Sequence, residues 1–348
     1  IALGDAETVA LAGLVVGLLF GVSAQKSGFC LRASVVEFSR GQLGPRTAVW
    51  LLCFSTALLW TQAMAAGGLV SLGESRWLAQ PSSISGAVIG GLIFGAGMVL
   101  ARGCPGRLLV LSATGNLRAI LSGLVFAVAA QVSLRGLAAP WRAELAALET
   151  TEGPNPQVAE MLGLPGWTAI ALGIGAALVA LWMAARNRVS VRLLVFGSGV
   201  GFAAAAGWLL TYQLSMLTFD PTPIESLTFS GPSADTLMFV LTPDHPLDFD
   251  IGLVPGVFLG AFLAAAHGRE LKWQGWSGAQ SMHRYLIGAA LMGFGAMLAG
   301  GCSIGAGVTG TSAMALTAWI ALTAMWAGGT ATDAILDRRG ASPAAATT

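Results

Sequence analysis

Long apolar segments restrict the fold of this chain more than any other feature. A helix needs about 20 apolar residues to cross the roughly 30 Å hydrocarbon core of a bilayer. Only 10% of the residues are charged, compared with about 25% in soluble domains. The sequence therefore predicts an all-α integral membrane protein that forms one polytopic domain over residues 1–348. The expected spans are 7–25, 46–70, 85–101, 117–138, 166–185, 192–214, 251–267, 284–299 and 313–331.

Charges in the connecting loops predict the orientation of these nine spans. Basic residues gather near 40–46, 186–192 and 269–284, whereas loop 139–165 holds four glutamates and loop 215–250 has no Lys or Arg. Basic loops favour the cytoplasmic side of a membrane. We therefore expect 139–165 and 215–250 to be external loops, with the N-terminus outside and the C-terminus inside.

An internal repeat is visible when Ile89–Cys104, "IGGLIFGAGMVLARGC", is compared with Ile287–Cys302, "IGAALMGFGAMLAGGC". Half of the sixteen positions are identical without a gap. On the predicted topology the two copies run in opposite directions through the membrane. Inverted repeats with a site near the midplane are a recurring plan in transporters. We expect residues 7–138 to form the first repeat half and 166–331 the second, although no cysteine near 193–230 matches the first cysteine motif.

Glycine–cysteine pairs interrupt the apolar segments at three places. Gly28 precedes Cys30, Gly103 precedes Cys104 and Pro105, and Gly301 precedes Cys302. Proline and glycine end helices, and an interrupted backbone at membrane depth is tolerated only where protein or a water-filled cavity surrounds it. The pattern predicts short re-entrant half-helices whose N-termini suit an anion. Glycine used only for close helix packing is the alternative.

Cysteine at these breaks suits a soft, sulfur-bearing anion, because a thiol is a weak and polarizable donor that tolerates apolar surroundings. Cys53 has no glycine neighbour and is expected to be a core residue. Lys26 and Arg107 lie beside the breaks and are candidates for attracting the anion. Cytoplasmic positive charge explains both residues equally well.

Other classes of function find little support. With a net charge of +1, nothing indicates nucleic-acid binding. The four cysteines form no CxxC pair, and the three histidines lie in loops or at helix ends, so we expect no metal and no cofactor. We find no nucleotide-binding motif, which favours passive or sink-driven transport. A membrane thiol oxidoreductase or sulfurtransferase remains an alternative if a thiol is activated, and a membrane scaffold is a third.

The segments "SGFCLRASVVEF", "ARGCPGRLLVLSATGN" and "GFGAMLAGGCSIGAGVTG" resemble the YeeE/YedE family of bacterial inner-membrane proteins. The resemblance covers roughly residues 9–331. It implies that the protein is a transporter rather than an enzyme, and that it takes up thiosulfate or a related sulfur or selenium compound. It also implies an hourglass-shaped monomer. It also implies that Cys30, Cys104 and Cys302 pass the anion along by S–H hydrogen bonds. Some members work with a small cytosolic sulfur carrier of the TusA type, which we expect here as a separate protein.

Overall fold

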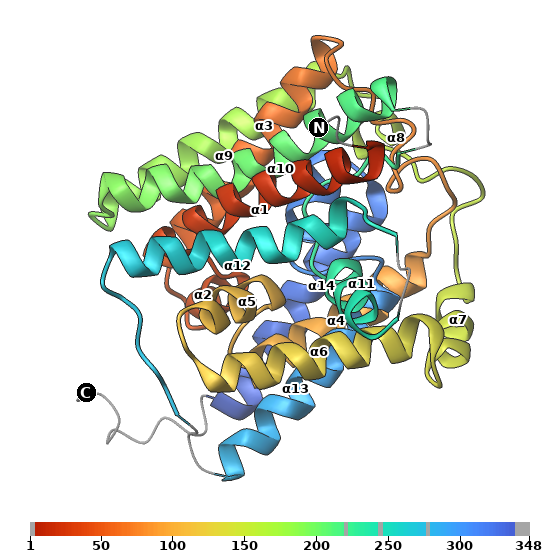
Figure 1. Cartoon of the computed structure of the whole chain (residues 1–348). Coiled ribbons are helices and arrows are strands. Elements are labelled where there is room, and N and C mark those ends of the chain that lie inside the picture. The colour runs from red at the N-terminus through yellow and green to blue at the C-terminus, as the bar shows by residue number, and fades with distance from the viewer. Residues whose placement is uncertain (1–3, 219–221, 243–245, 276–278, 338–348) are drawn as a thin grey trace.

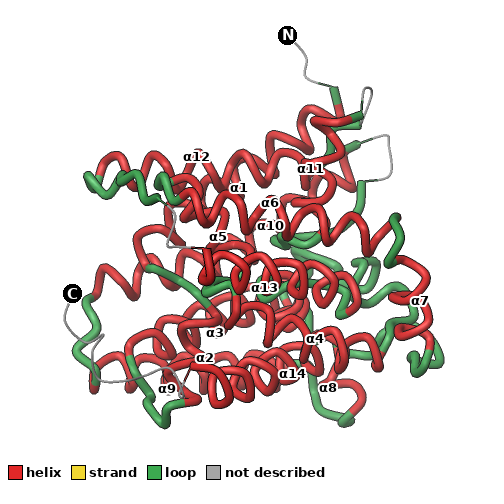
Figure 2. The backbone as a smooth tube through the Cα atoms, turned by 90° about the horizontal axis from the view of Figure 1, so that it is seen from below, coloured by secondary structure: helices red, strands yellow, loops and turns green. Residues whose placement is uncertain are grey.

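The structure, a computed structural model, describes residues 4–218, 222–242, 246–275 and 279–337, and these residues are helical apart from turns, loops and isolated bridges. Long helices run side by side and enclose several short ones (Figure 1; Figure 2). In order, the elements are α1 (Asp5–Ser27), α2 (Leu31–Ser39), α3 (Pro45–Ala66), α4 (Ile84–Leu100), α5 (Pro105–Ala113), α6 (Leu117–Arg135), α7 (Ala139–Ala147), α8 (Val158–Met161), α9 (Trp167–Arg186), α10 (Val191–Leu217), α11 (Gly231–Leu241), α12 (Phe249–His267), α13 (Ala279–Leu298), the π-helical turn η1 (Gly305–Gly310), α14 (Leu316–Thr332) and the π-helical turn η2 (Asp333–Asp337).

Seven helical stretches within the described residues are long and apolar enough to cross a membrane. They coincide with seven of the nine expected spans, and two of them, Asp5–Ser39 and Ile84–Ala113, include a Gly–Cys break and the short helix after it. The expected spans 284–299 and 313–331 coincide with α13, of 20 residues, and α14, of 17 residues. At 1.5 Å per residue, α14 is about 26 Å long. The prediction of an all-α integral membrane protein is confirmed.

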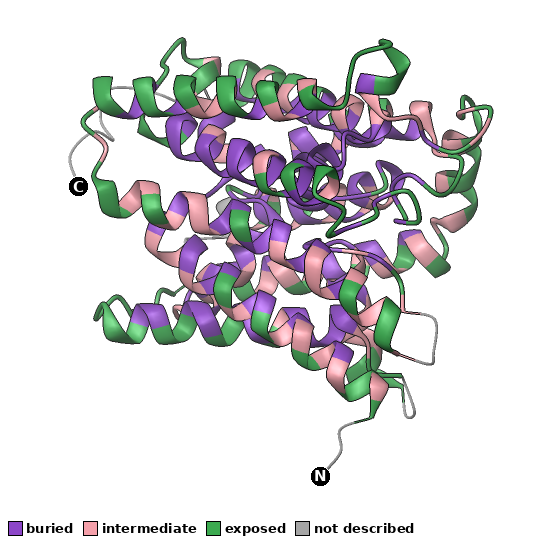
Figure 3. Ribbon diagram, turned by 90° about the horizontal axis from the view of Figure 1, so that it is seen from above, coloured by how far each residue is buried: buried purple, intermediate pink, exposed green. Residues whose placement is uncertain are grey.

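The outer helices present apolar side chains to their surroundings. Buried residues gather inside the bundle, whereas exposed positions follow the outward faces (Figure 3). On α9 the side chains of Leu178 and Trp182 are 63% and 57% exposed. Large exposed apolar faces are unusual in soluble monomers and are what a lipid environment requires. Among the long helices, α9 is packed mainly against α3.

The two repeat copies cross each other through reciprocal glycine contacts. Gly90 of α4 lies against Gly295 of α13, and Gly97 lies against Gly288, so each contact repeats the other with the helices exchanged. A Cβ atom on Gly295 would stand 2.8 Å from the Gly90 carbonyl oxygen. Small residues at such crossings allow membrane helices to approach closely. The two copies are therefore antiparallel partners about a local two-fold axis.

The same axis relates most of the fold. Helix α1 packs on α12 as α10 packs on α3, and α4 packs on α14 as α13 packs on α6. The elements α1 to α6 thus correspond in order to α10, α11, α12, α13, η1 and α14. In the sequence, helices α7 to α9 lie between the two sets, and neither set contains a second copy of them.

Segment 215–250 differs from the external loop that the sequence predicts. Helix α10 continues to Leu217, and α11 occupies residues 231–241. The chain before α11 is buried, with Leu227 and Phe229 at 0% and 1% exposure. Residues 224–230 therefore return into the protein, where these apolar side chains fill space in the core.

Candidate functional site

Four short elements begin in the interior of the protein, where the long helices are interrupted. Residues Cys30, Cys104 and Ser230 precede α2, α5 and α11, and Cys302 lies three residues before η1. The first three begin between long helices that extend past them (Figure 1). The start of a helix leaves backbone N–H groups without helical partners. The arrangement therefore places several such N–H groups in the core of the bundle.

Cys30 and Cys104 face each other. Both are buried, with exposures of 9% and 1%, and their side chains act on each other. The Ala33 N–H lies close to the Cys30 sulfur, and the Arg107 N–H lies close to the Cys104 sulfur. Each thiol thus lies at a helix start, where partial positive charge favours an anion.

Arg107 adds a full positive charge to this pair of thiols. Its guanidinium interacts electrostatically with both Cys30 and Cys104. Its Nη1 atom is buried and has no hydrogen-bond partner among the residues that the structure describes. A buried donor without a partner is costly, so this nitrogen is available to an incoming acceptor.

Cys302 is held by backbone donors from two different elements. Its Sγ atom accepts hydrogen bonds from the Phe229 N–H, at 3.4 Å, and from the Gly305 N–H, at 3.5 Å. The next residue, Ser303, lies beside the Cys104 thiol. The buried Ser303 hydroxyl has no partner that meets hydrogen-bond geometry in the described chain. Cys104 therefore lies beside both Cys30 and Ser303, and Ser303 directly follows Cys302 in the chain.

The three predicted glycines have different surroundings. Gly28 ends α1 in the left-handed conformation, with φ of 63°, where glycine is favoured. Gly103 lies against Leu108, and Gly301 lies against the Trp77 ring. The left-handed residues of these two breaks are instead Arg102, with φ of 55°, and Gly300, with φ of 75°. At Gly103 and Gly301 the preceding residue therefore makes the turn, whereas Gly28 makes its own.

Lys26 has a local partner that the sequence does not indicate. Its Nζ atom lies 3.3 Å from Glu270 Oε1, and its side chain is 5% exposed. Glu270 also accepts a 2.7 Å hydrogen bond from Gln25. Burial alone would raise the pKa of Glu270, but the hydrogen bonds from Gln25 and Lys26 and the Lys26 charge lower it overall. The positive charge of Lys26 is therefore neutralised by a direct ion pair, whereas Glu270 acts on Arg107 only through its charge.

Ser230 and Thr228 are site residues that the sequence analysis missed. Ser230 is the two-fold counterpart of Cys30, because each follows a phenylalanine, Phe229 or Phe29, and each precedes a short helix. The hydroxyl oxygens of Ser230 and Thr228 lie 3.2 Å apart. Both residues are buried. The Phe-Cys and Phe-Ser pairs, two hundred positions apart, are the signal that could have located them.

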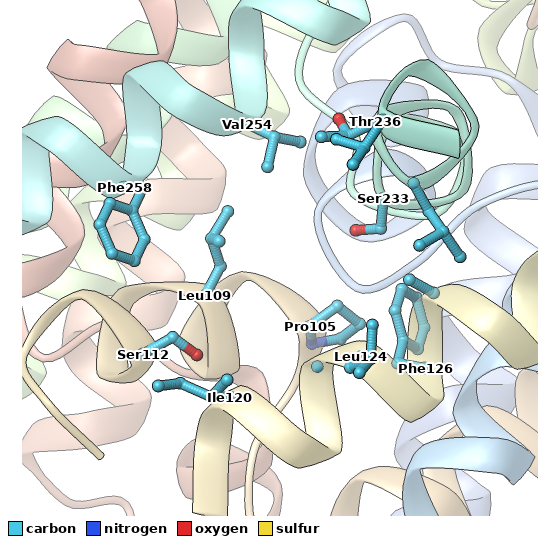
Figure 4. A pocket seen from close by; sticks show the side chains of 14 residues that line it. Pro105, Leu109, Ser112, Ile120, Leu124, Phe126, Ser233, Thr236, Val254 and Phe258 are labelled. Carbon is cyan, nitrogen blue, oxygen red and sulfur yellow. The ribbon is translucent and has the colours of Figure 1, made fainter. Parts of the chain in front are cut away.

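Among the cavities outside this centre, two differ clearly in their lining. One, of about 360 Å³, includes Arg76, Arg142 and the backbone near Gly300 at its wall. The other, of about 530 Å³, lies between α5, α6, α11 and α12 and is lined mainly by apolar side chains such as Leu109 and Phe258 (Figure 4). Its apolar lining suits hydrocarbon rather than an anion.

Comparison with known proteins agrees with this picture. Residues 26–331 match the model of the family described as "Sulphur transport". The chain is 28% identical to the thiosulfate transporter TsuA of Escherichia coli, covering 90% of this chain and 91% of that protein. It is 29% identical to the thiosulfate transporter TsuA of Spirochaeta thermophila, covering 89% and 93%.

Proposed function

Because the chain belongs to the sulphur transport family, we propose that it carries thiosulfate, or a closely related sulfur-containing anion, across the membrane. The relatives are named as transporters rather than as enzymes. The observation that carries the proposal is the pairing of the Cys30 and Cys104 thiols at two helix starts beside the unpartnered Arg107 nitrogen. The thiols and the backbone N–H groups are hydrogen-bond donors and Arg107 carries a positive charge. A small anion needs both hydrogen-bond donors and positive charge around it.

The proposed path runs from Cys302 through Cys104 to Cys30. Each S–H group donates one weak hydrogen bond to the terminal sulfur of the anion and then yields it to the next thiol. The adjacent glycines Gly28, Gly103 and Gly301 leave room for the backbone to turn at each step. Arg107 offsets the charge of the anion near the thiol pair. Lys26 acts less directly in this scheme, because Glu270 already pairs with it.

Location and partners follow from the loop charges and the family resemblance. We propose a bacterial inner membrane, a periplasmic N-terminus and a cytoplasmic C-terminus, so that the Lys26 end of α1 faces the cytoplasm. A monomer would suffice, because both repeat halves lie in one chain. A separate TusA-like sulfur-carrier protein is the proposed acceptor at the cytoplasmic face.

The test is uptake of labelled thiosulfate into proteoliposomes. We expect each of Cys30→Ala, Cys104→Ala and Cys302→Ala to lower the uptake rate by at least about tenfold, because each removes one donor from the path. Cys53→Ala is the matched control, since Cys53 is a buried free thiol on α3 with no place in the proposed path. A wild-type protein that is folded but inactive would contradict the proposed substrate.

Serine variants separate a hydrogen-bonding path from covalent sulfur chemistry. A hydroxyl still donates a hydrogen bond, so Cys→Ser variants should keep part of the uptake. Complete loss in all three serine variants, with folding intact, would favour a covalent role for the thiols.

A further inference from the structure

The two regions that the two-fold relation exchanges differ in their charged groups. Near α2 and α5 the charged groups include Arg107 and Arg46 together with the carboxylates of Glu37 and Glu270, so both signs are present. Near α11 and the start of α12 they are mainly carboxylates, namely Glu225, Asp235, Asp248 and Asp250. We refer to these four residues, which all come from the acidic segment 215–250, as the carboxylate cluster. Arg76 is the cation whose charge acts on it.

Asp250 is the most enclosed member of the cluster. It lies in the first turn of α12 and is 8% exposed. Its Oδ1 atom is buried and has no hydrogen-bond partner in the described part of the chain. A buried acceptor without a donor is costly, and a proton on the carboxyl group would lower that cost by removing the buried charge.

A second carboxylate lies close to Asp250. A Cβ atom on Gly231, the first residue of α11, would be 3.5 Å from Asp250 Oδ2 and 3.7 Å from Asp235 Oδ2. Both oxygens therefore flank the start of α11, directly after Ser230 in the candidate site. Both carboxylates thus lie near the same residue, and neighbouring like charges disfavour ionisation of both groups. The charged neighbours that act on Asp250 are Glu225, Arg76, Asp248 and Asp235.

Glu225 connects the carboxylate cluster to the candidate site. It lines a small cleft with Arg76, Trp77 and Thr228, and Thr228 contacts Ser230. Burial raises the pKa of Glu225 to about 7, and Asp248 and Asp235 add to the effect against the opposing charge of Arg76. Protonation of this group is thus balanced near neutral pH.

We propose that the carboxylate cluster takes up a proton from the external side as the anion arrives, and that this proton then travels inward with the anion and leaves the cluster ionised again, so that influx of the anion is coupled to influx of protons. The proposal rests on the function proposed above. An anion beside Arg76 adds negative charge next to Glu225 and so favours its protonation, and by linkage the protonated cluster favours the anion to the same degree. Thiosulfate carries two negative charges, and a potential of about 100 mV, negative inside, opposes inward movement of each charge by about 50-fold. An accompanying proton cancels one of these charges.

The experiment measures thiosulfate accumulation in proteoliposomes under an imposed pH gradient, with the membrane potential clamped. One proton per anion predicts about tenfold more accumulation for each unit by which the outside is more acidic, and an uncoupled path predicts no change. We expect Glu225→Gln and Asp250→Asn to lose this dependence and to keep uptake without a gradient. Glu160→Gln, which changes an exposed acid of α8, is the matched control and should behave like the wild type.

The outcomes separate the two proposals. Wild-type uptake that ignores the pH gradient, or that follows a sodium gradient instead, would overturn proton coupling and leave thiosulfate transport intact. Absence of any wild-type uptake would overturn the proposed function and this inference with it. If the variants do not fold, calorimetry on the wild type decides: thiosulfate binding in two buffers of different ionisation enthalpy should show proton uptake, and its absence would refute the proposal.

Discussion

Replacing Gly295 with alanine should destabilise the crossing of α4 and α13. The added Cβ atom would lie 2.6 Å from the Phe94 amide nitrogen and 2.8 Å from the Gly90 carbonyl oxygen. Both neighbours are backbone atoms of α4, so no side chain can rotate away and the helices must separate. Overpacking of this kind costs about 1–3 kcal/mol. Alanine's better helix propensity returns at most about 1 kcal/mol.

The assay is thermal unfolding in detergent, followed by thiosulfate uptake. Gly123→Ala on α6 is the matched control, because a Cβ atom there meets nothing within 4 Å, so its melting temperature should stay unchanged or rise. We expect Gly295→Ala to melt several degrees below the wild type. Gly97 of α4 is the position that the two-fold axis relates to Gly295. A Cβ atom there would lie 2.7 Å from the Gly288 carbonyl oxygen, so Gly97→Ala should lower the stability by a similar amount. Wild-type stability for both variants would refute the described crossing.

Two more predictions concern charged groups. Asp333→Asn should cost about 1 kcal/mol in thermal unfolding, because Asp333 is buried and accepts hydrogen bonds from Ser39 at 2.7 Å and Arg40 at 3.1 Å, while Arg40 is 46% exposed. Burial acts to raise the pKa of Asp333, but the hydrogen bonds from Arg40 and Ser39 lower it overall. This contribution to stability should therefore be present at neutral pH and disappear below about pH 4, as the carboxylate is protonated. A difference in stability between wild type and variant that does not change with pH would contradict this. Arg107→Gln should lower thiosulfate uptake at least about tenfold. Its melting temperature should change little, because the buried Nη1 atom has no hydrogen-bond partner to lose among the described residues. Arg135→Gln, at the end of α6, is the control, and equal uptake by the two variants would refute the role of Arg107.

The breaks were predictable because they depend on local chemistry. Proline after Cys104, and glycine next to each thiol, end helices regardless of what surrounds them. Short helices follow at α2, α5 and η1, as expected. The fourth short helix, α11, was not predicted, because a search for cysteine passes over Ser230. The repeat halves are also offset by different amounts, two hundred residues from Phe29 to Phe229 but fewer from Cys104 to Cys302, so only one ungapped match was visible.

Long-range pairing was beyond the sequence. Lys26 resembles a free cation beside a break until Glu270, 244 positions away, is placed next to it. Asp250 resembles a solvated loop acid until α12 is seen to begin before it and bury it. In both cases local sequence shows the charge, and only the packing of distant helices shows whether that charge has a partner.

Helix α9 has no two-fold counterpart, and its single crossing sets the orientation of the second repeat half in the membrane. The first repeat half crosses the membrane four times, through α1, α3, α4 and α6 on the predicted topology. After an even number of crossings, a second copy joined directly would begin on the same side as the first, and the two would lie parallel. One additional crossing reverses the second copy and allows α4 to meet α13 head to tail. A chain shortened by α9 would keep every residue of the candidate site, yet its halves would be oriented so that the four helix starts could not meet.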